Sequence, residues 1–213
     1  MASSSRRVGA ETSKTRDILL DWVEKMMLEE GYASISYRAL ATKAEISPSL
    51  VQYYFPSLDD IFVAAIRRYN ERNVAYLTAA LEVRSEDPLR AVWEYSGGES
   101  TGAMITEFMA LGNHRKTIQS EIAAVTESIR SAQLAALVAK YGKDARPIGN
   151  LSLPALQLLI SGLPKLLSLE ENIGVKSAHT EVTKAFERFI DELEPKAAPI
   201  KRKPATRRKA AAG

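Results

Sequence analysis

The stretch from residue 36 to residue 55 constrains the fold more than any other part of the chain. Ser36 and Ser47 can each accept a hydrogen bond from an amide in the first turn of a following helix. Pro48 suits the first position of a helix, where its missing N–H is not needed. The sequence Glu45-Ile46-Ser47 interrupts the apolar pattern between them. The stretch therefore predicts two short helices joined by a tight turn.

The second of these helices has one apolar face and one polar face. Val51 and Phe55 are four residues apart and share a side, whereas Ser49, Gln52 and Tyr53 lie on the opposite side. A short helix with a polar front of this kind fits the major groove of DNA, where amide and hydroxyl groups read base edges. The pattern favours a DNA-reading function.

Residues 15–62 resemble the DNA-binding domain of TetR-family transcriptional repressors. The motifs that carry the resemblance are Glu29-Glu30-Gly31-Tyr32 at the end of a first helix, then residues 35–41, 44–47 and 50–57. They hold one register over about the first third of the chain. The resemblance implies an all-α fold, with an N-terminal three-helix helix-turn-helix domain and a C-terminal helical domain for ligand binding and dimerisation.

Two positions depart from the family pattern. Glu45 stands where the family usually has glycine, so a left-handed backbone there would be strained by about 1–2 kcal/mol. Leu58 stands where the family often has lysine, so one phosphate contact is missing. Specificity should therefore rest largely on Gln52 and its neighbours.

The candidate DNA contacts divide into base readers and phosphate binders. The Gln52 amide can bond the N6 and N7 edge of adenine, and Leu50 could touch a thymine methyl. Tyr54 could bond a phosphate or be partly buried beside Phe55, and Gln52 could be an idle exposed amide. The full set of candidates is Lys14, Thr15, Ser36, Tyr37, Arg38, Ser47, Pro48, Ser49, Leu50, Gln52, Tyr53 and Tyr54.

The rest of the chain reads as helices, without the period-two alternation of strands. We expect helices over about 15–30, 57–84, 88–95, 100–113, 115–141, 153–171 and 175–193, with the helix at 153–171 broken or bent at Pro164. The expected organisation is a disordered basic arm (1–13), a helix-turn-helix domain (14–62) linked by the helix 57–84, an effector-binding and dimerisation domain (85–195) and a disordered basic tail (196–213).

Charge is distributed unevenly along the chain. Residues 196–213 contain seven Lys or Arg residues and no acid, and residues 1–16 contain four against one acid, so the body is net acidic although the whole chain is +3. Basic ends could contact phosphates or simply keep the protein soluble.

The composition predicts a cytoplasmic protein without a cofactor. The absence of cysteine excludes disulfides and thiolate metal sites, and two histidines leave little for a metal site. The N-terminus is too polar for a signal peptide, and the apolar run at 151–169 contains too many polar residues to span a membrane.

We expect a small apolar effector among the helices of residues 88–171. Candidate lining residues, although such residues are more often plain core than pocket, are Trp93, Met104, Phe108, Met109, Leu111, Leu156 and Leu159. Glu107, Asn113, His114 and Arg115 could supply a polar anchor or form a solvated helix junction.

In TetR-family proteins the last two helices pair with their symmetry mates, so the resemblance implies a homodimer on a palindromic double-stranded operator. Candidate interface residues are Leu158, Leu166, Phe186, Phe189 and Ile190.

One motif points to another function and is rejected. Gly98-Glu99-Ser100-Thr101-Gly102 matches G-x-S-x-G, but a nucleophile elbow needs a strand before the serine, and here a helix is expected. We therefore predict that the chain is not an enzyme. Two functions remain: a repressor released from its operator by a ligand, or an effector-independent architectural DNA-binding protein that spreads along DNA through its basic tail.

Overall fold

The computed structural model describes residues 14–195, and the side chains of all of these except residues 99–102. The expected basic arm (1–13) and basic tail (196–213) lie outside the described residues. Within residues 14–195 there are nine α-helices, one short 3-10 helix and no β-strand. The prediction of an all-α fold with an N-terminal helix-turn-helix is confirmed.

The helices keep the order expected from the sequence. Their bounds are α2 Lys14–Glu30, the 3-10 turn Tyr32–Ser34, α3 Tyr37–Lys43, α4 Pro48–Tyr54, α5 Leu58–Val83, α6 Pro88–Ser96, α7 Glu99–Gly112, α8 Lys116–Tyr141, α9 Leu153–Asn172 and α10 His179–Leu193.

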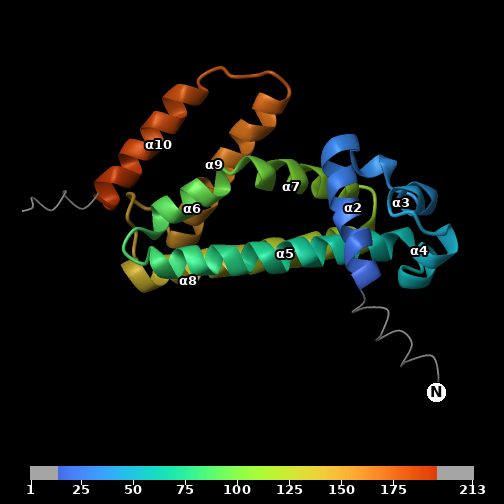
Figure 1. The fold of residues 1–213 in the computed structure, drawn as a ribbon. Helices are drawn as coiled ribbons and strands as arrows, with labels where there is room; N and C mark the ends of the chain where they lie inside the picture. Colours follow the sequence, from blue (N-terminus) through green and yellow to red (C-terminus); the bar gives the residue numbers. More distant parts are fainter. Residues whose placement is uncertain (1–13, 196–213) are drawn as a thin grey trace, which may run out of the picture.

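Two long helices form the central pair of the molecule. α5 and α8 pack side by side along its length, with α2, α3 and α4 gathered at one end and α6, α9 and α10 at the other (Figure 1). α7 lies between the two ends and packs against α2, α8 and α9. By length and apolar composition alone α8 could cross a membrane, but here it packs against α5, α7 and α9.

The apolar interior consists of two clusters. The first joins the buried faces of α2, α3, α4 and the start of α5 to Met104, Phe108 and Leu111 of α7 and Ile118 of α8. The second joins the far half of α5 to α6, α8, α9 and α10. The first cluster crosses the expected boundary between residues 14–62 and 85–195. The helix-turn-helix therefore shares its core with the helical body, which is the name used below for residues 85–195 and the part of α5 that packs on them.

A buried carboxylate attaches the end of α10 to the start of α6. The side chain of Glu194 is 3% exposed and accepts hydrogen bonds from the amides of Leu89 (2.8 Å) and Arg90 (2.9 Å) and from the hydroxyl of Tyr141 (2.7 Å). These two amides are orphan donors in the first turn of α6, where a negative charge also suits the helix dipole. This interaction joins residues more than a hundred positions apart. Burial raises the pKa of Tyr141, and the hydrogen bond to this carboxylate raises it further.

The helix bounds exclude the expected break at Pro164 and correct the expected start of the last helix. α9 runs unbroken through Pro164, which is buried in the helix, so the loss of one hydrogen bond there does not end it. α10 begins at His179 and not at Val175. Gly174, with φ of 84°, ends α9 in a Schellman arrangement in which the Val175 amide donates to the Glu170 carbonyl at 2.9 Å.

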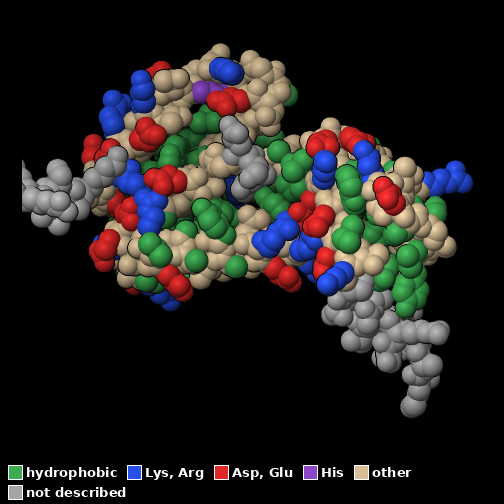
Figure 2. Space-filling model, in the orientation of Figure 1, with side chains coloured by type: hydrophobic (Ala, Val, Ile, Leu, Met, Phe, Trp, Pro, Cys, Tyr) green, Lys and Arg blue, Asp and Glu red, His purple; other side chains and the backbone are tan. Residues whose placement is uncertain are grey.

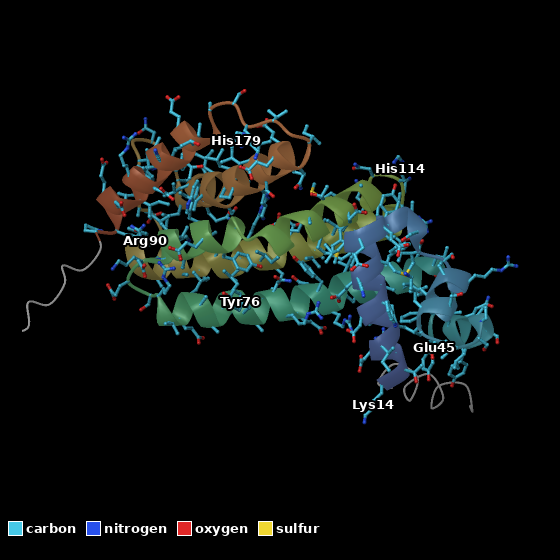
Figure 3. The ribbon with its side chains drawn as sticks, turned by 45° about the horizontal axis from the view of Figure 1, so that its top comes forward. Lys14, Glu45, Tyr76, Arg90, His114 and His179 are labelled. Atoms are coloured by element: carbon cyan, nitrogen blue, oxygen red, sulfur yellow. The ribbon has the colours of Figure 1, made fainter. Side chains whose placement is uncertain are left out.

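The connection into α10 is held by a histidine between two acids. His179 lies where the linking loop enters α10 (Figure 3), and Ala178 before it has a strained φ of 63°. The Nε2 atom of His179 is 2.7 Å from a Glu170 carboxylate oxygen, and Nδ1 is 3.4 Å from Glu171. The hydrogen bond with Glu170 is the main cause that raises the pKa of His179 above 6.5, and Glu171 raises it further.

This cluster predicts that the protein loses stability as the pH rises. A raised folded-state pKa means that the stabilisation from His179 is complete below about pH 6.5 and is lost as the pH rises through the folded-state value. We expect the denaturation midpoint of the wild type to exceed that of His179→Gln at about pH 6, and the gap to shrink by about pH 8.5.

The control for this measurement is His114→Gln, because His114 is exposed and distant from this loop. A gap between wild type and His179→Gln that stays constant with pH would contradict the assignment.

Candidate nucleic-acid interface

Side-chain caps begin α3 and α4, the two helices of the helix-turn-helix. This helix-turn-helix domain, residues 14–62, is called the reading head below. The hydroxyl of Ser36 accepts from the Ala39 amide at 3.2 Å, and that of Ser47 accepts from the Leu50 amide at 3.3 Å. Pro48 occupies the first turn of α4. These caps confirm the local predictions and fix where each helix begins.

The turn between α3 and α4 places Glu45 in a conformation that favours glycine. Its φ is 55°, its amide donates to Thr42 at 3.4 Å, and the next amide, of Ile46, donates to Ala41 at 3.0 Å. These two bonds are those of a Schellman motif, whose C′ residue is left-handed. The strain expected at Glu45 is therefore present.

α4 turns its apolar side inward and its polar side outward. Val51 and Phe55 are at most 1% exposed, whereas Leu50 is 36% and Tyr53 is 52% exposed. Gln52 is exposed and has no hydrogen-bond partner within residues 14–195. Figure 2 shows hydrophobic side chains at the surface over α4, while acidic and basic side chains mix over α2. The Gln52 amide is therefore free to pair with an external donor–acceptor edge.

The tyrosines and serines around α4 are partly used within the protein. The hydroxyl of Tyr37 donates to the Phe55 carbonyl at 3.1 Å, and burial followed by the charge of Asp60 raises its pKa. The Ser49 hydroxyl is 3.0 Å from that of Ser47. The rings of Tyr53 and the half-buried Tyr54 meet edge to face at 5.4 Å.

The flanks of the head carry exposed cations. Arg38 and Lys14 are exposed at the starts of α3 and α2, and Thr15 is partly exposed. Figure 3 shows Lys14 on the same end of the molecule as Glu45. Ser36 and Pro48 are exposed as well, so these predicted residues of α3 and α4 are also accessible to solvent.

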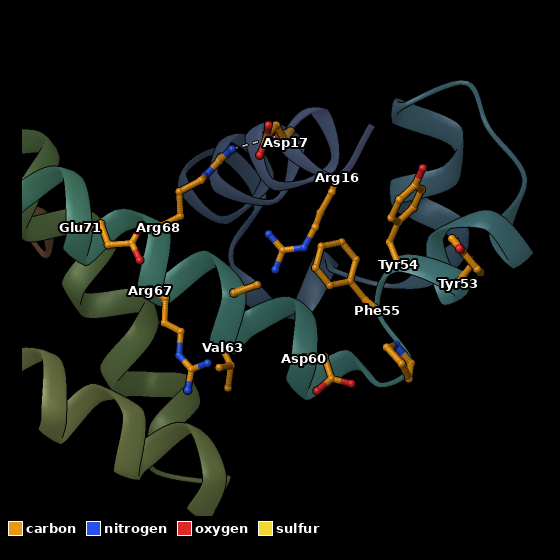
Figure 4. A pocket seen from close by; sticks show the side chains of 12 residues that line it. Arg16, Asp17, Tyr53, Tyr54, Phe55, Asp60, Val63, Arg67, Arg68 and Glu71 are labelled. Carbon is orange, nitrogen blue, oxygen red and sulfur yellow. Dashed lines mark hydrogen bonds between the residues drawn. The ribbon is translucent and has the colours of Figure 1, made fainter. Parts of the chain in front are cut away.

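A groove of about 710 Å³ between α2, α4 and α5 adds one residue that sequence reasoning missed. Arg16 reaches into it and places its guanidinium 5.1 Å from the centre of the Phe55 ring (Figure 4). Tyr53 and Tyr54 line the same groove. Arg16 could have been found from its place in the first turn of the first helix, on the side that faces the end of α4.

Polar contacts fasten the head to the body. Glu107 of α7 accepts from the Tyr32 amide at 2.7 Å, and Arg115 forms an ion pair with Asp59. Both residues are among the expected polar anchors for a ligand, but their partners are in the head. Arg68 of α5 pairs with Glu24 of α2 at 2.9 Å.

The body contains an apolar cavity of about 200 Å³ between α5, α7, α8 and α9. Of the predicted lining residues, Phe108 and Met109 border it. The others lie elsewhere: Met104 and Leu111 in the first core cluster, Leu156 in the second, Trp93 stacked on Phe186, and Leu159 exposed on α9.

The predicted interface residues fall in three environments. Leu166 is 52% exposed on α9, and Leu158 is exposed there at the edge of the cavity. Phe186 and Phe189 pack against the second core cluster. Ile190 is fully buried within the protomer, so it is not available to a partner.

The strain at the turn predicts a stabilising substitution. Glu45→Gly removes the Cβ that disfavours φ of 55°, and we expect it to stabilise the fold by about 1 kcal/mol and to raise the melting temperature. Glu45→Ala removes the charge but keeps the Cβ, so it serves as the matched control. If Glu45→Gly melts no higher than Glu45→Ala, strain at this residue is refuted.

Comparison with known proteins agrees with this architecture. No protein-family model matches the chain. A helix-turn-helix transcriptional regulator encoded in the dhlA 5′ region of Xanthobacter autotrophicus is 40% identical over 63 residues, which are 30% of this chain and 29% of that protein. The chain therefore spans less than a third of that relative's length in the match.

Two solved structures share the fold over most of both chains. A TetR-family transcriptional regulator from Rhodococcus sp. has a TM-score of 0.67 at 18% identity, over 85% of this chain and 100% of its own. A transcriptional regulator from Saccharomonospora viridis in complex with choline has a TM-score of 0.71 at 14% identity, over 85% and 97%. With its helix-turn-helix head on an all-α body, the chain has the fold of TetR-family transcriptional regulators.

Proposed function

We propose that the protein is a transcriptional repressor that binds a palindromic operator as a homodimer and releases it on binding a small effector. The observation that supports this most is the outward face of α4, where Gln52 is exposed and unpartnered while Val51 and Phe55 hold the helix in place. A helix held from behind with a free polar front is suited to direct readout in the major groove.

One helix relates the cavity to the reading head. α7 contributes Phe108 both to the cavity wall and to the core beneath the head, and Glu107 of the same helix accepts from the Tyr32 amide. A ligand that moves α7 would therefore change the packing under the head. For release, the ligand must bind the released form more tightly than the DNA-bound form.

The dimer contact would use α9. Leu158, Leu159, Leu166 and Leu169 of this helix are each at least 41% exposed, although large apolar side chains are costly to leave in water. Pairing of this face with its symmetry mate would bury these leucines and present two copies of α4 to two half-sites, about 34–36 Å apart or a multiple of that distance.

Selection of bound sequences from a random DNA pool tests this function against the architectural alternative. A specific repressor should enrich one palindrome and prefer it over random DNA by at least about a thousandfold. Equal binding to all sequences would support the alternative, in which the basic residues of 196–213 spread the protein along DNA. Repeating the selection without residues 196–213 separates the contribution of the tail.

Gln52→Ala is expected to weaken operator binding and relax the preference at one base pair. Loss of a bidentate amide–adenine contact costs about 1–3 kcal/mol, or roughly 5- to 150-fold in affinity. The control is Arg38→Ala, which should weaken binding to all sequences alike and lower the salt slope by about one. Unchanged specificity in Gln52→Ala would remove this residue from the readout.

Charges on the exposed α9 face should dissociate the dimer. Leu159 and Leu166 are seven residues apart on one face, so the double substitution Leu159→Glu/Leu166→Glu places four like charges across a symmetric contact. Light scattering after gel filtration should show the mass fall from dimer to monomer. Val83→Glu, at a still more exposed apolar residue at the end of α5, is the control. A double variant that remains dimeric would exclude this face.

A further inference from the structure

The cavity in the body has apolar walls, and its polar side chains are cations or neutral groups that can donate hydrogen bonds. Its walls come from four helices and include Ile66, Ile105, Phe108, Val125 and Ile129. Its polar lining includes Arg130 and Gln133 on α8 and Ser161 and Lys165 on α9, together with Tyr69 on α5 and Thr126 on α8, whose hydroxyl already donates to the Ile122 carbonyl. No aspartate or glutamate is among the described residues that line it.

The two cations of the lining are poorly neutralised. Lys165 has no ion-pair or hydrogen-bond partner within residues 14–195. Burial lowers the pKa of Lys165, and the positive charge of Arg130 lowers it further. Arg130 itself has one acid nearby, Glu127 at 3.7 Å, but that carboxylate is 72% exposed, so the pair is weak. The cavity therefore has an excess of positive charge.

The neutral polar groups also present donors. Gln157 donates through Nε2 to the Oε1 atom of Gln133 at 2.5 Å and to the Ser161 hydroxyl at 3.2 Å. Gln157 thereby occupies the acceptor oxygen of Gln133. The buried Nε2 donor of Gln133 has no acceptor among the described residues. Ser161 accepts from Gln157, so its own proton can still be donated. A buried donor without a partner is costly unless a bound group accepts from it.

We propose that this cavity takes a small amphipathic anion, a ring or short chain carrying a carboxylate, and that Arg130, Gln133, Ser161 and Lys165 receive the carboxylate. A carboxylate is acceptor-only and binds such donors through charge-assisted hydrogen bonds. The cavity volume of about 200 Å³ suits a ligand of about one aromatic ring, since a cavity of about 150 Å³ holds benzene. The biological role of this site rests on the proposed repressor function, but the binding itself does not.

A cationic ligand is disfavoured by the same groups. The choline-bound regulator from Saccharomonospora viridis shares the fold, and its ligand is a quaternary ammonium ion. Such a charge would face Arg130 and Lys165 here with no carboxylate in the described lining to offset them. The likeness in fold therefore does not extend to the charge of the ligand.

Three shape-matched probes test the sign of the charge. Calorimetric titration of the full chain, without DNA and at fixed salt, would compare phenylacetate, 2-phenylethanol and 2-phenylethylamine. We expect phenylacetate to bind at least about tenfold more tightly than the amine, with the alcohol between them. Failure of phenylacetate to bind, or equal or tighter binding of the amine, would overturn the proposal.

Two substitutions place the binding in this cavity. Lys165→Met keeps an apolar stem and removes the charge, so it should weaken phenylacetate binding about tenfold or more and leave 2-phenylethanol unchanged. Gly162 lines the cavity, and the position that a Cβ would take there faces open space. The larger side chain of Gly162→Leu should therefore fill the cavity and abolish binding of all probes. Lys140→Met, also a charge removal but on the exposed part of α8, is the matched control.

Folding and function are separated by further readouts. Lys165→Met removes a buried charge and should melt no lower than the wild type. Unchanged phenylacetate binding in both Lys165→Met and Gly162→Leu would place the anion elsewhere and refute the site.

Operator binding is then measured with and without phenylacetate. If the anion binds as expected but never affects DNA binding, the site stands and the ligand-controlled function fails. If another compound releases the operator while phenylacetate does not bind, the function stands and the anion site fails.

Discussion

The helix-turn-helix of this protein shares its hydrophobic core with the body. The buried faces of α2, α3, α4 and the start of α5 pack against one another and against Met104, Phe108 and Leu111 of α7 and Ile118 of α8. Because apolar burial is the dominant stabilising term in folding, the reading head cannot change its tilt without repacking these side chains. Phe108 and Ile66 belong to this core and also line the cavity, so the same two side chains contribute to the packing under the head and to the cavity wall.

Local chemistry explains why the reading head could be predicted from the sequence. Ser36, Ser47 and Pro48 act within one helical turn of themselves, so their roles as caps and helix starts do not depend on the rest of the fold. The strain at Glu45 follows from the turn alone. The inward side of α4 follows from the four-residue spacing of Val51 and Phe55, which are both buried as expected.

The proposed ligand site could not be predicted in the same way, because it depends on which helices pack together. Met104, Phe108 and Leu111 look alike in sequence, and only the packing of α7 against α8 and α9 separates core from cavity wall. The polar lining was missed altogether: Gln133 and Lys165 lie on different helices, more than thirty residues apart, and look like ordinary surface residues. The start of α10 was missed because Gly174 ends α9 by a backbone motif that apolar periodicity does not reveal.

The double role of α7 has a consequence for sensitivity. Coupling between two binding sites is reciprocal, so in the proposed repressor DNA must lower the affinity for the ligand by the same factor by which the ligand lowers the affinity for DNA. In a regulator built this way, the ligand concentration that triggers a response is not a property of the cavity alone. Through the contacts of Phe108 and Glu107, it also depends on how well each operator holds the head. Genes behind weak operators would respond at lower ligand concentrations than genes behind strong ones, although the same protein serves both.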